Sequence, residues 1–262
     1  MRTAALFISH GSPAVALEKD DYTRSLKRFA DDHPTPLAIV VVSAHWEAPG
    51  PIRVTAAPRP SLIYDFAGFP EALYRITYGC PGSPDLAREI VALLTGAGMA
   101  AAPEGRRGLD HGAWVPLSLL YPRADVPVVE VSLPVPRAPH DLRRVGEALG
   151  ALRERGVLLL GSGGVVHNLA RVVFEDKRAP VEPWAAAFDA WVRDRLAAGE
   201  LEAIASYRQK APHADLAVPT TEHFDPIFFT LGAASSSRDR PVTVYEGFHH
   251  GTLSMRSFAL EE

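Results

Sequence analysis

Stretches of almost uninterrupted apolar residues, separated by segments with helical periodicity, constrain the fold of this chain more than any other feature. The apolar stretches cover residues 5–8, 37–47, 126–133 and 157–164. Such runs are typical of parallel strands that are buried on both faces of a sheet. Apolar residues recur at helical spacing in the intervening segments 20–33, 83–98 and 141–156. The pattern predicts an α/β fold in which helices flank a mostly parallel central sheet.

The last third of the chain departs from this alternation. Residues 182–199 and 222–234 are expected to form helices, whereas 241–248 and 253–260 are expected to pair as antiparallel strands at one edge of the sheet. The segment AASSSRDRP, at 233–241, is expected to be an exposed loop. Hydrophobic residues make up 47% of the 262 positions, enough for a core, and no repeat or linker interrupts them. We therefore expect residues 1–262 to form one domain.

Charge and cysteine content exclude several kinds of protein. The net charge is −4 and there is no block of Lys and Arg, which argues against a nucleic-acid partner. No apolar run is long enough to span a bilayer. The single cysteine, Cys80, rules out a disulfide framework and a zinc site built from several cysteines, and it suits the reducing cytoplasm. Any bound metal must therefore be held by nitrogen and oxygen ligands.

Five histidines occur where a ligand site is expected. His10, His45 and His167 follow or end predicted strands, and His111 and His223 lie in turn-rich segments beside Gly or Pro. In open α/β sheets, ligands bind at the carboxyl ends of the strands. Neutral imidazole suits zinc, iron, copper and nickel, and a catalytic metal site needs about three protein ligands with one position open. Each histidine alone is compatible with an ordinary loop residue, but together they favour a metal site.

The remaining histidines are expected outside this site. His33, His140 and His213 adjoin proline or polar turn residues, which is typical of exposed loops. His249 and His250 are adjacent on a predicted strand, so at most one of them could face the site.

Other candidate groups fit less well. Gly161, Gly163 and Gly164 lack the spacing of a nucleotide-binding loop, and the glycines are expected to allow close approach of another backbone segment. Ser162 is not in a Gly-x-Ser-x-Gly nucleophile elbow, which argues against a serine hydrolase.

Three aromatic residues lie beside the selected histidines in the sequence. Trp46, Trp114 and Phe224 could stack on an aromatic substrate, although the alternative of core packing is common for such residues.

An ordered set of motifs resembles a known family. The motifs are SHGSP (9–13), SAHWE (43–47), LDHGAWVPL (109–117), GSGGVVHNL (161–169), PTTEHFDP (219–226) and YEGFHHGTLSMRSF (245–258). Together they resemble the class III extradiol ring-cleavage dioxygenases, in the 4,5-DOPA dioxygenase branch of the LigB-like superfamily, over nearly the whole chain. The resemblance implies a single α/β domain that inserts both atoms of O2 into a DOPA-like catechol and opens its ring beside the two hydroxyls.

The resemblance also implies roles for individual residues. His10, His45 and His223 would be the metal ligands, and His167 would be the acid–base histidine, with a possible approach to the metal. His111 would be a second pocket histidine that contacts the substrate. Fe(II) would be the active metal, and the catechol and O2 would be the small-molecule partners. The sequence does not indicate an oligomeric state.

One feature of this ligand set has a physical consequence. Better-known members of the superfamily are described with two histidines and a glutamate, whereas here His223 takes the place of the carboxylate, and its neighbour Glu222 is expected to point away. A site of three neutral histidines leaves the +2 charge of the ion uncompensated, which should favour a doubly deprotonated catechol. The same site should accept Zn(II) in tetrahedral geometry, so zinc is expected to compete with iron.

Three functions remain open at this point. The first is the extradiol dioxygenase, and the second is a zinc-dependent hydrolase in which His167 is the base for a metal-activated water. The third is a binding protein without catalysis on the same scaffold. Fold alone does not separate them, because function depends on the site.

Overall fold

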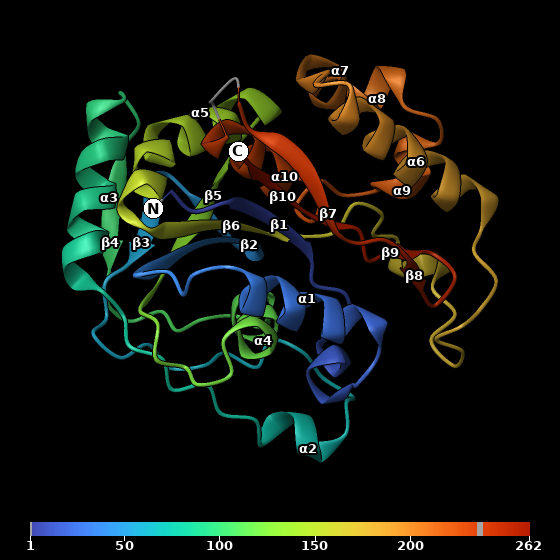
Figure 1. The fold of residues 1–262 in the computed structure, drawn as a ribbon, viewed down its shortest axis with the longest axis horizontal. Helices are drawn as coiled ribbons and strands as arrows, with labels where there is room; N and C mark the ends of the chain where they lie inside the picture. Colours follow the sequence, from blue (N-terminus) through green and yellow to red (C-terminus); the bar gives the residue numbers. More distant parts are fainter. Residues whose placement is uncertain (1, 235–237) are drawn as a thin grey trace.

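Within residues 2–234 and 238–262, which are those that this computed structural model describes, eight strands form one sheet in the order β4-β3-β5-β2-β6-β1-β10-β7 (Figure 1). The strands are β1 (Ala5–Ser9), β2 (Ala38–Pro49), β3 (Ile52–Thr55), β4 (Ala101–Glu104), β5 (Val128–Val135), β6 (Val157–Gly163), β7 (Arg240–Tyr245) and β10 (Ser257–Glu261). The central run β5-β2-β6-β1 is parallel, and β10 and β7 add an antiparallel pair beside β1. The predicted α/β class, with its parallel centre and antiparallel edge pair, is confirmed.

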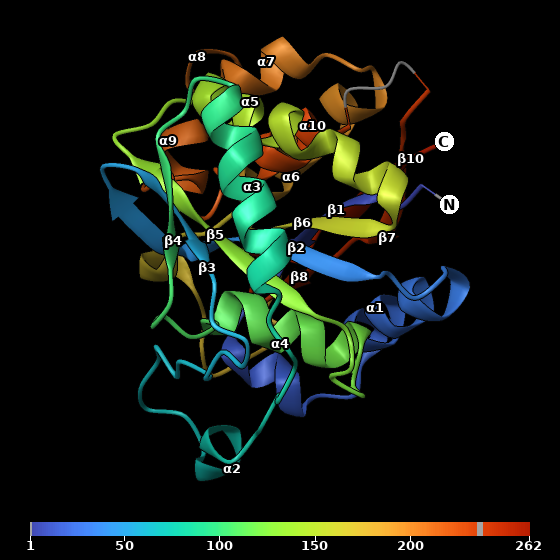
Figure 2. The same cartoon turned by 90° about the vertical axis from the view of Figure 1, so that its left-hand side faces the viewer.

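Helices cover both faces of the sheet, and Figure 2 shows the two layers from the side. One hydrophobic cluster joins the sheet to α3, α5, α6 and α10, and a second joins its other face to α1 and α4. The helices are α1 (Asp21–Asp32), α2 (Glu71–Tyr74), α3 (Pro84–Gly96), α4 (His111–Leu120), α5 (Pro139–Leu149), α6 (Pro183–Ala197), α7 (Leu201–Ala205), α8 (Tyr207–Lys210), α9 (Ala214–Ala217) and α10 (Pro226–Ala233). Short 3-10 helices cover Pro13–Leu17, Gly150–Arg155 and Leu169–Arg171.

The apolar run of β2 is continuous because both of its faces are buried. Val40 and Val42 pack into the cluster with α3 and α5, whereas Ile39 and Val41 pack into the cluster with α1 and α4. Alternate residues of a strand face opposite sides, so a strand between two helical layers has no position for solvated polar residues.

Some elements were not predicted. Strands β3 and β4 have four residues each and lack a clear apolar pattern. Helix α4 has Pro116 in its interior and is buried nearly all round, so its sequence shows no amphipathic period. The expectation that His111 lies in a loop was therefore wrong, because this residue is the first of α4.

The predicted strand over 253–260 is interrupted. A separate two-stranded sheet pairs β8 (Phe248–His249) with β9 (Leu253–Ser254), and β10 starts only at Ser257. Between β9 and β10, Arg256 donates to both carboxylate oxygens of Asp189 on α6. This buried ion pair anchors the segment between β9 and β10 to α6. Of the predicted loop at 233–241, residues 235–237 lie outside the described residues.

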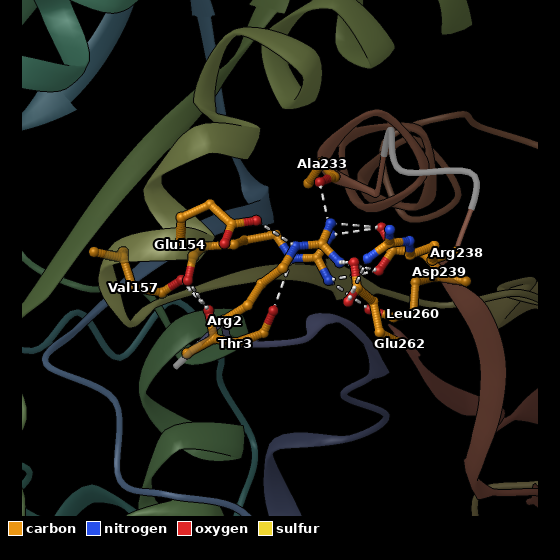
Figure 3. A network of polar contacts seen from close by, with 10 residues as sticks. Arg2, Thr3, Glu154, Val157, Ala233, Arg238, Asp239, Leu260 and Glu262 are labelled. Carbon is orange, nitrogen blue, oxygen red and sulfur yellow. Dashed lines mark hydrogen bonds and ion pairs between the residues drawn. The ribbon is translucent and has the colours of Figure 1, made fainter.

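A buried arginine network joins the two ends of the chain at the amino-terminal edge of the parallel strands (Figure 3). Arg153 has a fully buried side chain and donates to both carboxylate oxygens of Asp239. It also donates to the carbonyl oxygens of Thr3, Ala233 and Leu260. All of its N–H groups thus have acceptors, which a buried guanidinium requires.

In the described part of the chain, no helix combines the length and the apolar character needed to cross a membrane.

Candidate metal and catalytic site

Three of the predicted histidines meet at the carboxyl-terminal edge of the parallel strands. His10 follows β1, His45 lies on β2, and His223 lies in the turn before α10. Their ring centroids are 5.0 Å apart for His10 and His45, 5.3 Å for His10 and His223, and 4.9 Å for His45 and His223. One ring nitrogen from each lies within 4.8 Å of the others.

Local backbone features allow this meeting. The pairing of β2 with β5 shifts register between Val42 and Glu47, and His45 lies in that interruption, although β2 itself continues to Pro49. On β6, a Cβ atom at Gly163 would lie 2.1 Å from the carbonyl oxygen of His223. The prediction of close backbone approach is confirmed for Gly161, where a Cβ would lie 2.4 Å from the carbonyl oxygen of Pro226, and for Gly163, which faces the turn that carries a candidate ligand. It is wrong for Gly164, where the nearest atom would be 3.7 Å away.

Each of the three histidines has an acceptor at Nδ1. Nδ1 of His10 lies 3.0 Å from Oγ of Ser162, and that hydroxyl donates to the carbonyl oxygen of Gly112, so it accepts from the ring. Nδ1 of His223 forms a hydrogen bond of 3.0 Å with Oε1 of Glu222, whereas Nδ1 of His45 makes a longer ion-pair contact, 3.4 Å, with Oδ2 of Asp65. A proton held at Nδ1 leaves the lone pair at Nε2, which is how second-shell acceptors orient metal-binding histidines.

The Nε2 atoms fit a shared cation. Nε2 of His10 and Nε2 of His45 are 3.1 Å apart. Two imidazole nitrogens bound to one tetrahedral zinc ion would be about 3.3 Å apart, given Zn–N bonds of about 2.0–2.1 Å. Two bare lone pairs at this separation repel each other, so either a proton or a cation must lie between them. The donor set therefore fits a metal ion such as zinc or iron.

The rings are kept neutral. Burial, together with the neighbouring imidazoles, lowers the pKa of His10 and of His223 well below the ordinary value. Burial and the adjacent His111 lower the pKa of His45 to about 4. Neutral imidazole is the metal-binding form, so the lone pairs are available near neutral pH.

His167 lies beside the three-histidine cluster in a different geometry. Its ring stacks on that of His223 with centroids 3.4 Å apart and planes only 8° from parallel. A nitrogen lone pair lies in the plane of its ring, so two stacked parallel rings direct their lone pairs within separate, nearly parallel planes. Burial lowers the pKa of His167 to about 4, so this ring is also neutral near pH 7.

His111 joins the cluster from the start of α4. Its ring centroid is 3.9 Å from that of His45. Its Nδ1 lies 2.9 Å from Oδ1 of Asp65, although the ring N–H does not point directly at that oxygen. Burial alone would raise the pKa of Asp65, but the contacts with His111 and His45 lower it to about 2, so the carboxylate is ionised.

Two carboxylates change the expected charge of the site. Glu222 was expected to point away, but its Oε1 contacts the ring of His223 and accepts from the hydroxyl of Thr220. Glu222 lies in a turn, and its flexible side chain folds back beside the ring of His223. Asp65, which no sequence motif marked, contacts the other side of the cluster. The +2 charge of a bound ion would therefore be flanked by two carboxylates one shell out.

The predicted aromatic residues differ in position. Trp46 is buried under the guanidinium of Arg107, whose Cζ lies 4.7 Å from its ring centroid. Trp114 and Phe224 are fully buried in the two hydrophobic clusters, as in the core alternative, and neither ring is exposed to a substrate. Phe66 was missed because its segment has no motif. This half-buried ring packs edge-on to His111 with centroids 5.6 Å apart.

The other histidines lie elsewhere. His140 and His213 are exposed as expected, whereas His33 is half-buried and its Nε2 lies 2.9 Å from Oε2 of Glu261. His249 is buried beside Asp20, and His250 contacts the backbone of Val173. A cavity of about 660 Å³ lined by Phe29, Leu37, Tyr121 and other residues opens at the opposite edge of the sheet, away from the histidine cluster.

Comparisons with known proteins identify the family of the chain. Residues 4–255 match the family described as the catalytic LigB subunit of aromatic ring-opening dioxygenase. A "4,5-DOPA dioxygenase extradiol" from Beta vulgaris is 39% identical over 263 residues, covering 96% of this chain and 94% of the relative. A protein of the same name from Escherichia coli K12 is 41% identical over 260 residues, covering 98% and 94%.

A solved structure has the same fold. The crystal structure of an uncharacterized protein from Escherichia coli K12 has a TM-score of 0.84 and 35% identity, covering 99% of this chain and all of the other. The family match covers nearly the whole chain, and the fold agrees throughout. The chain therefore belongs to the LigB family of aromatic ring-opening dioxygenases.

Proposed function

We propose that this enzyme opens the ring of a DOPA-like catechol beside its two hydroxyls and adds both atoms of O2, with a metal ion held by His10, His45 and His223. The observation that carries the proposal is the three imidazoles, each with Nδ1 against an acceptor and one nitrogen near the other two. The relatives named 4,5-DOPA dioxygenase extradiol support the choice of substrate class. Family membership also decides against the hydrolase and the non-catalytic binding protein.

We propose Fe(II) as the active metal, with Zn(II) as an ion that the same ligands would accept. A bound iron supplies the redox chemistry with O2 that zinc, which has no accessible second oxidation state, does not. The ligand residues hold the ion rigidly, because His10 and His45 are attached to central strands and His223 is pressed against β6.

His167 is proposed as the acid–base residue and not as a fourth ligand. Its ring lies face to face with that of His223, with centroids 3.4 Å apart and planes 8° from parallel, so the two rings would not both point a nitrogen lone pair at one ion. The neutral imidazole can accept a proton from a catechol hydroxyl and later return it to an oxygen of the product. Its half-buried position leaves it open to a substrate.

His111 is proposed to hydrogen-bond a substrate oxygen through Nε2. Its Nδ1 faces Asp65, so the other nitrogen remains for the pocket. The edge contact with Phe66 suggests that this ring forms an aromatic wall for the catechol, with Trp46 as a further candidate. We further propose that residues 1–262 act as one catalytic domain in the cytoplasm, a location supported by the single, buried thiol of Cys80.

Oxygen uptake by the iron-loaded enzyme tests the proposal. Protein reconstituted anaerobically with Fe(II) is mixed with DOPA, caffeate or protocatechuate in an oxygen electrode, and the product is weighed by mass spectrometry. We expect equal consumption of O2 and catechol and a product that has gained two oxygen atoms. His167→Ala should lose turnover by about 10²–10⁴-fold while keeping iron, the usual size of an acid–base contribution.

The matched control is His140→Ala, which removes an exposed imidazole away from the site. This variant should keep full activity. A folded, iron-loaded protein that consumes no O2 with any catechol of a broad panel would refute the proposed substrate class. Loss of iron in His167→Ala would instead make this residue a ligand.

A further inference from the structure

We infer that Asp65 is a positioning residue whose single carboxylate sets the ring orientation and tautomer of both His45 and His111. The inference rests on the proposed function, in which these residues serve as a metal ligand and a substrate contact. Asp65 lies outside the sheet, in the long connection between β3 and α3, and it neighbours no motif.

The contacts of Asp65 divide between its two oxygens. Oδ1 accepts the backbone N–H of His111 at 2.9 Å and lies 2.9 Å from Nδ1 of the same residue. Oδ2 lies 3.4 Å from Nδ1 of His45. One oxygen thus holds the first backbone N–H of α4 and lies beside the ring of the same residue, and the other faces the candidate ligand on β2.

The segment that carries Asp65 is itself fixed to α4. The backbone N–H of Ile63 donates to the carbonyl oxygen of Leu109, and that of Leu109 donates to Ser61. The indole N–H of Trp114 donates to the carbonyl oxygen of Ile63 at 3.0 Å. The backbone just before Asp65 is therefore tied to α4 by hydrogen bonds. This gives the fully buried Trp114 a supporting part in the site.

Asp65 opposes a competing arrangement of His45. Because Nε2 of His45 is 3.1 Å from Nε2 of His10, the ring could place its proton at Nε2 and donate to His10. That tautomer has no lone pair for a metal. A carboxylate beside Nδ1 favours the proton on Nδ1 itself and so keeps the lone pair of Nε2 free.

Asparagine at position 65 should impose the wrong tautomer. Its carbonyl oxygen must take the place of Oδ1, since the backbone N–H of His111 needs an acceptor there. The NH2 group then takes the place of Oδ2 and presents a donor to Nδ1 of His45. A donor pairs with a lone pair, so the His45 proton moves to Nε2. Alanine removes the acceptor without adding a donor.

Zinc titration of metal-free protein tests this reasoning. We expect the zinc Kd to rise about 10-fold in Asp65→Ala and about 100-fold in Asp65→Asn, within the usual range for a lost second-shell partner. The melting temperature should fall more in Asp65→Ala than in Asp65→Asn, since Asn keeps the acceptor at the start of α4 and Ala does not. A purely structural role predicts that affinity and melting temperature fall together.

The control is Asp141→Asn. Asp141 accepts the backbone N–H of Ala138 at the start of α5, so the same chemical change is made at another helix start, outside the five-histidine cluster. This variant should bind zinc like the wild type. In a His45→Ala background, Asp65→Asn should have no further effect on zinc affinity, because the ring on which it acts is absent.

The possible results distinguish a failure of the inference about Asp65 from a failure of the proposed ligand set. Wild-type zinc affinity in Asp65→Asn, or an affinity order that follows the melting temperatures, would overturn the inference alone. Complete loss of zinc in Asp65→Ala, equal to that in His45→Ala, would make Asp65 a ligand and also overturn it. Unchanged affinity in His45→Ala would refute the proposed ligand set itself.

Discussion

Replacement of Gly163 by alanine should disrupt the metal site more than a methyl group added at any other position of β6. A Cβ at this position would lie 2.1 Å from the carbonyl oxygen of His223. The same glycine supports a second ligand, because its carbonyl oxygen accepts the backbone N–H of His10 at 3.0 Å. The next residue donates to the turn, with N–H of Gly164 2.7 Å from the oxygen of His223.

The size of the effect follows from the distance. The added Cβ is about 1 Å closer to the oxygen than two such atoms can approach, so the turn of His223 must move away from β6 by about that amount. Overpacking of this kind costs about 1–3 kcal/mol, and the strained hydrogen bond from Gly164 adds about 1 kcal/mol. Metal sites need ligand distances within about 0.2 Å, so the zinc Kd should rise at least about 100-fold.

The assay pairs zinc titration with chemical denaturation of Gly163→Ala and Gly164→Ala. At Gly164 the nearest atom to an added Cβ is 3.7 Å away, which is an ordinary contact. The control Gly164→Ala therefore adds the same methyl group at the adjacent residue without a clash. The control should bind zinc within a few-fold of the wild type. Equal zinc affinity and equal stability in the two variants would refute the view that this close approach positions His223.

Three further predictions follow from other parts of the structure. The protein should bind about one metal ion per chain and melt at a lower temperature after chelation, since a ligand specific for the folded state stabilises it; His45→Ala should lose most of the metal by elemental analysis, and full retention would contradict its role. Arg153→Met should lower the free energy of unfolding by about 3–5 kcal/mol, because Asp239 and several carbonyl groups lose a buried partner. The control is Arg155→Met, at an exposed pair, which should leave the stability close to that of the wild type. Glu130 is fully buried, and burial together with the carboxylate of Asp110 raises its pKa well above 4.5. The folded wild type keeps the Glu130 proton, whereas the unfolded chain loses it above about pH 4.5, so the stability of the wild type falls as the pH rises. Glu130→Gln has no proton to lose at this position. The stability of Glu130→Gln relative to the wild type, measured by urea denaturation between pH 5 and 9, should therefore increase with pH, and a constant difference would show that Glu130 is ionised.

The sequence determined the class of fold, because burial leaves a direct pattern. A strand between two helical layers, such as β2, must be apolar at every position, and an amphipathic helix such as α1 repeats its apolar residues every three or four positions. The same logic failed for α4, which is buried all round, and for the short strands β3 and β4 at one edge. In those elements tertiary contacts, and not local pattern, decide the conformation.

The sequence also determined which histidines to consider, because strands of a parallel sheet end at a common edge. Only the tertiary structure decided how their rings are oriented. The stacking of His167 on His223, the return of Glu222 and the placement of Asp65 depend on turns and on a long connection with no sequence period. A histidine's position in the chain shows that a ligand is available, whereas its tautomer depends on the acceptor that the rest of the fold brings to the other nitrogen.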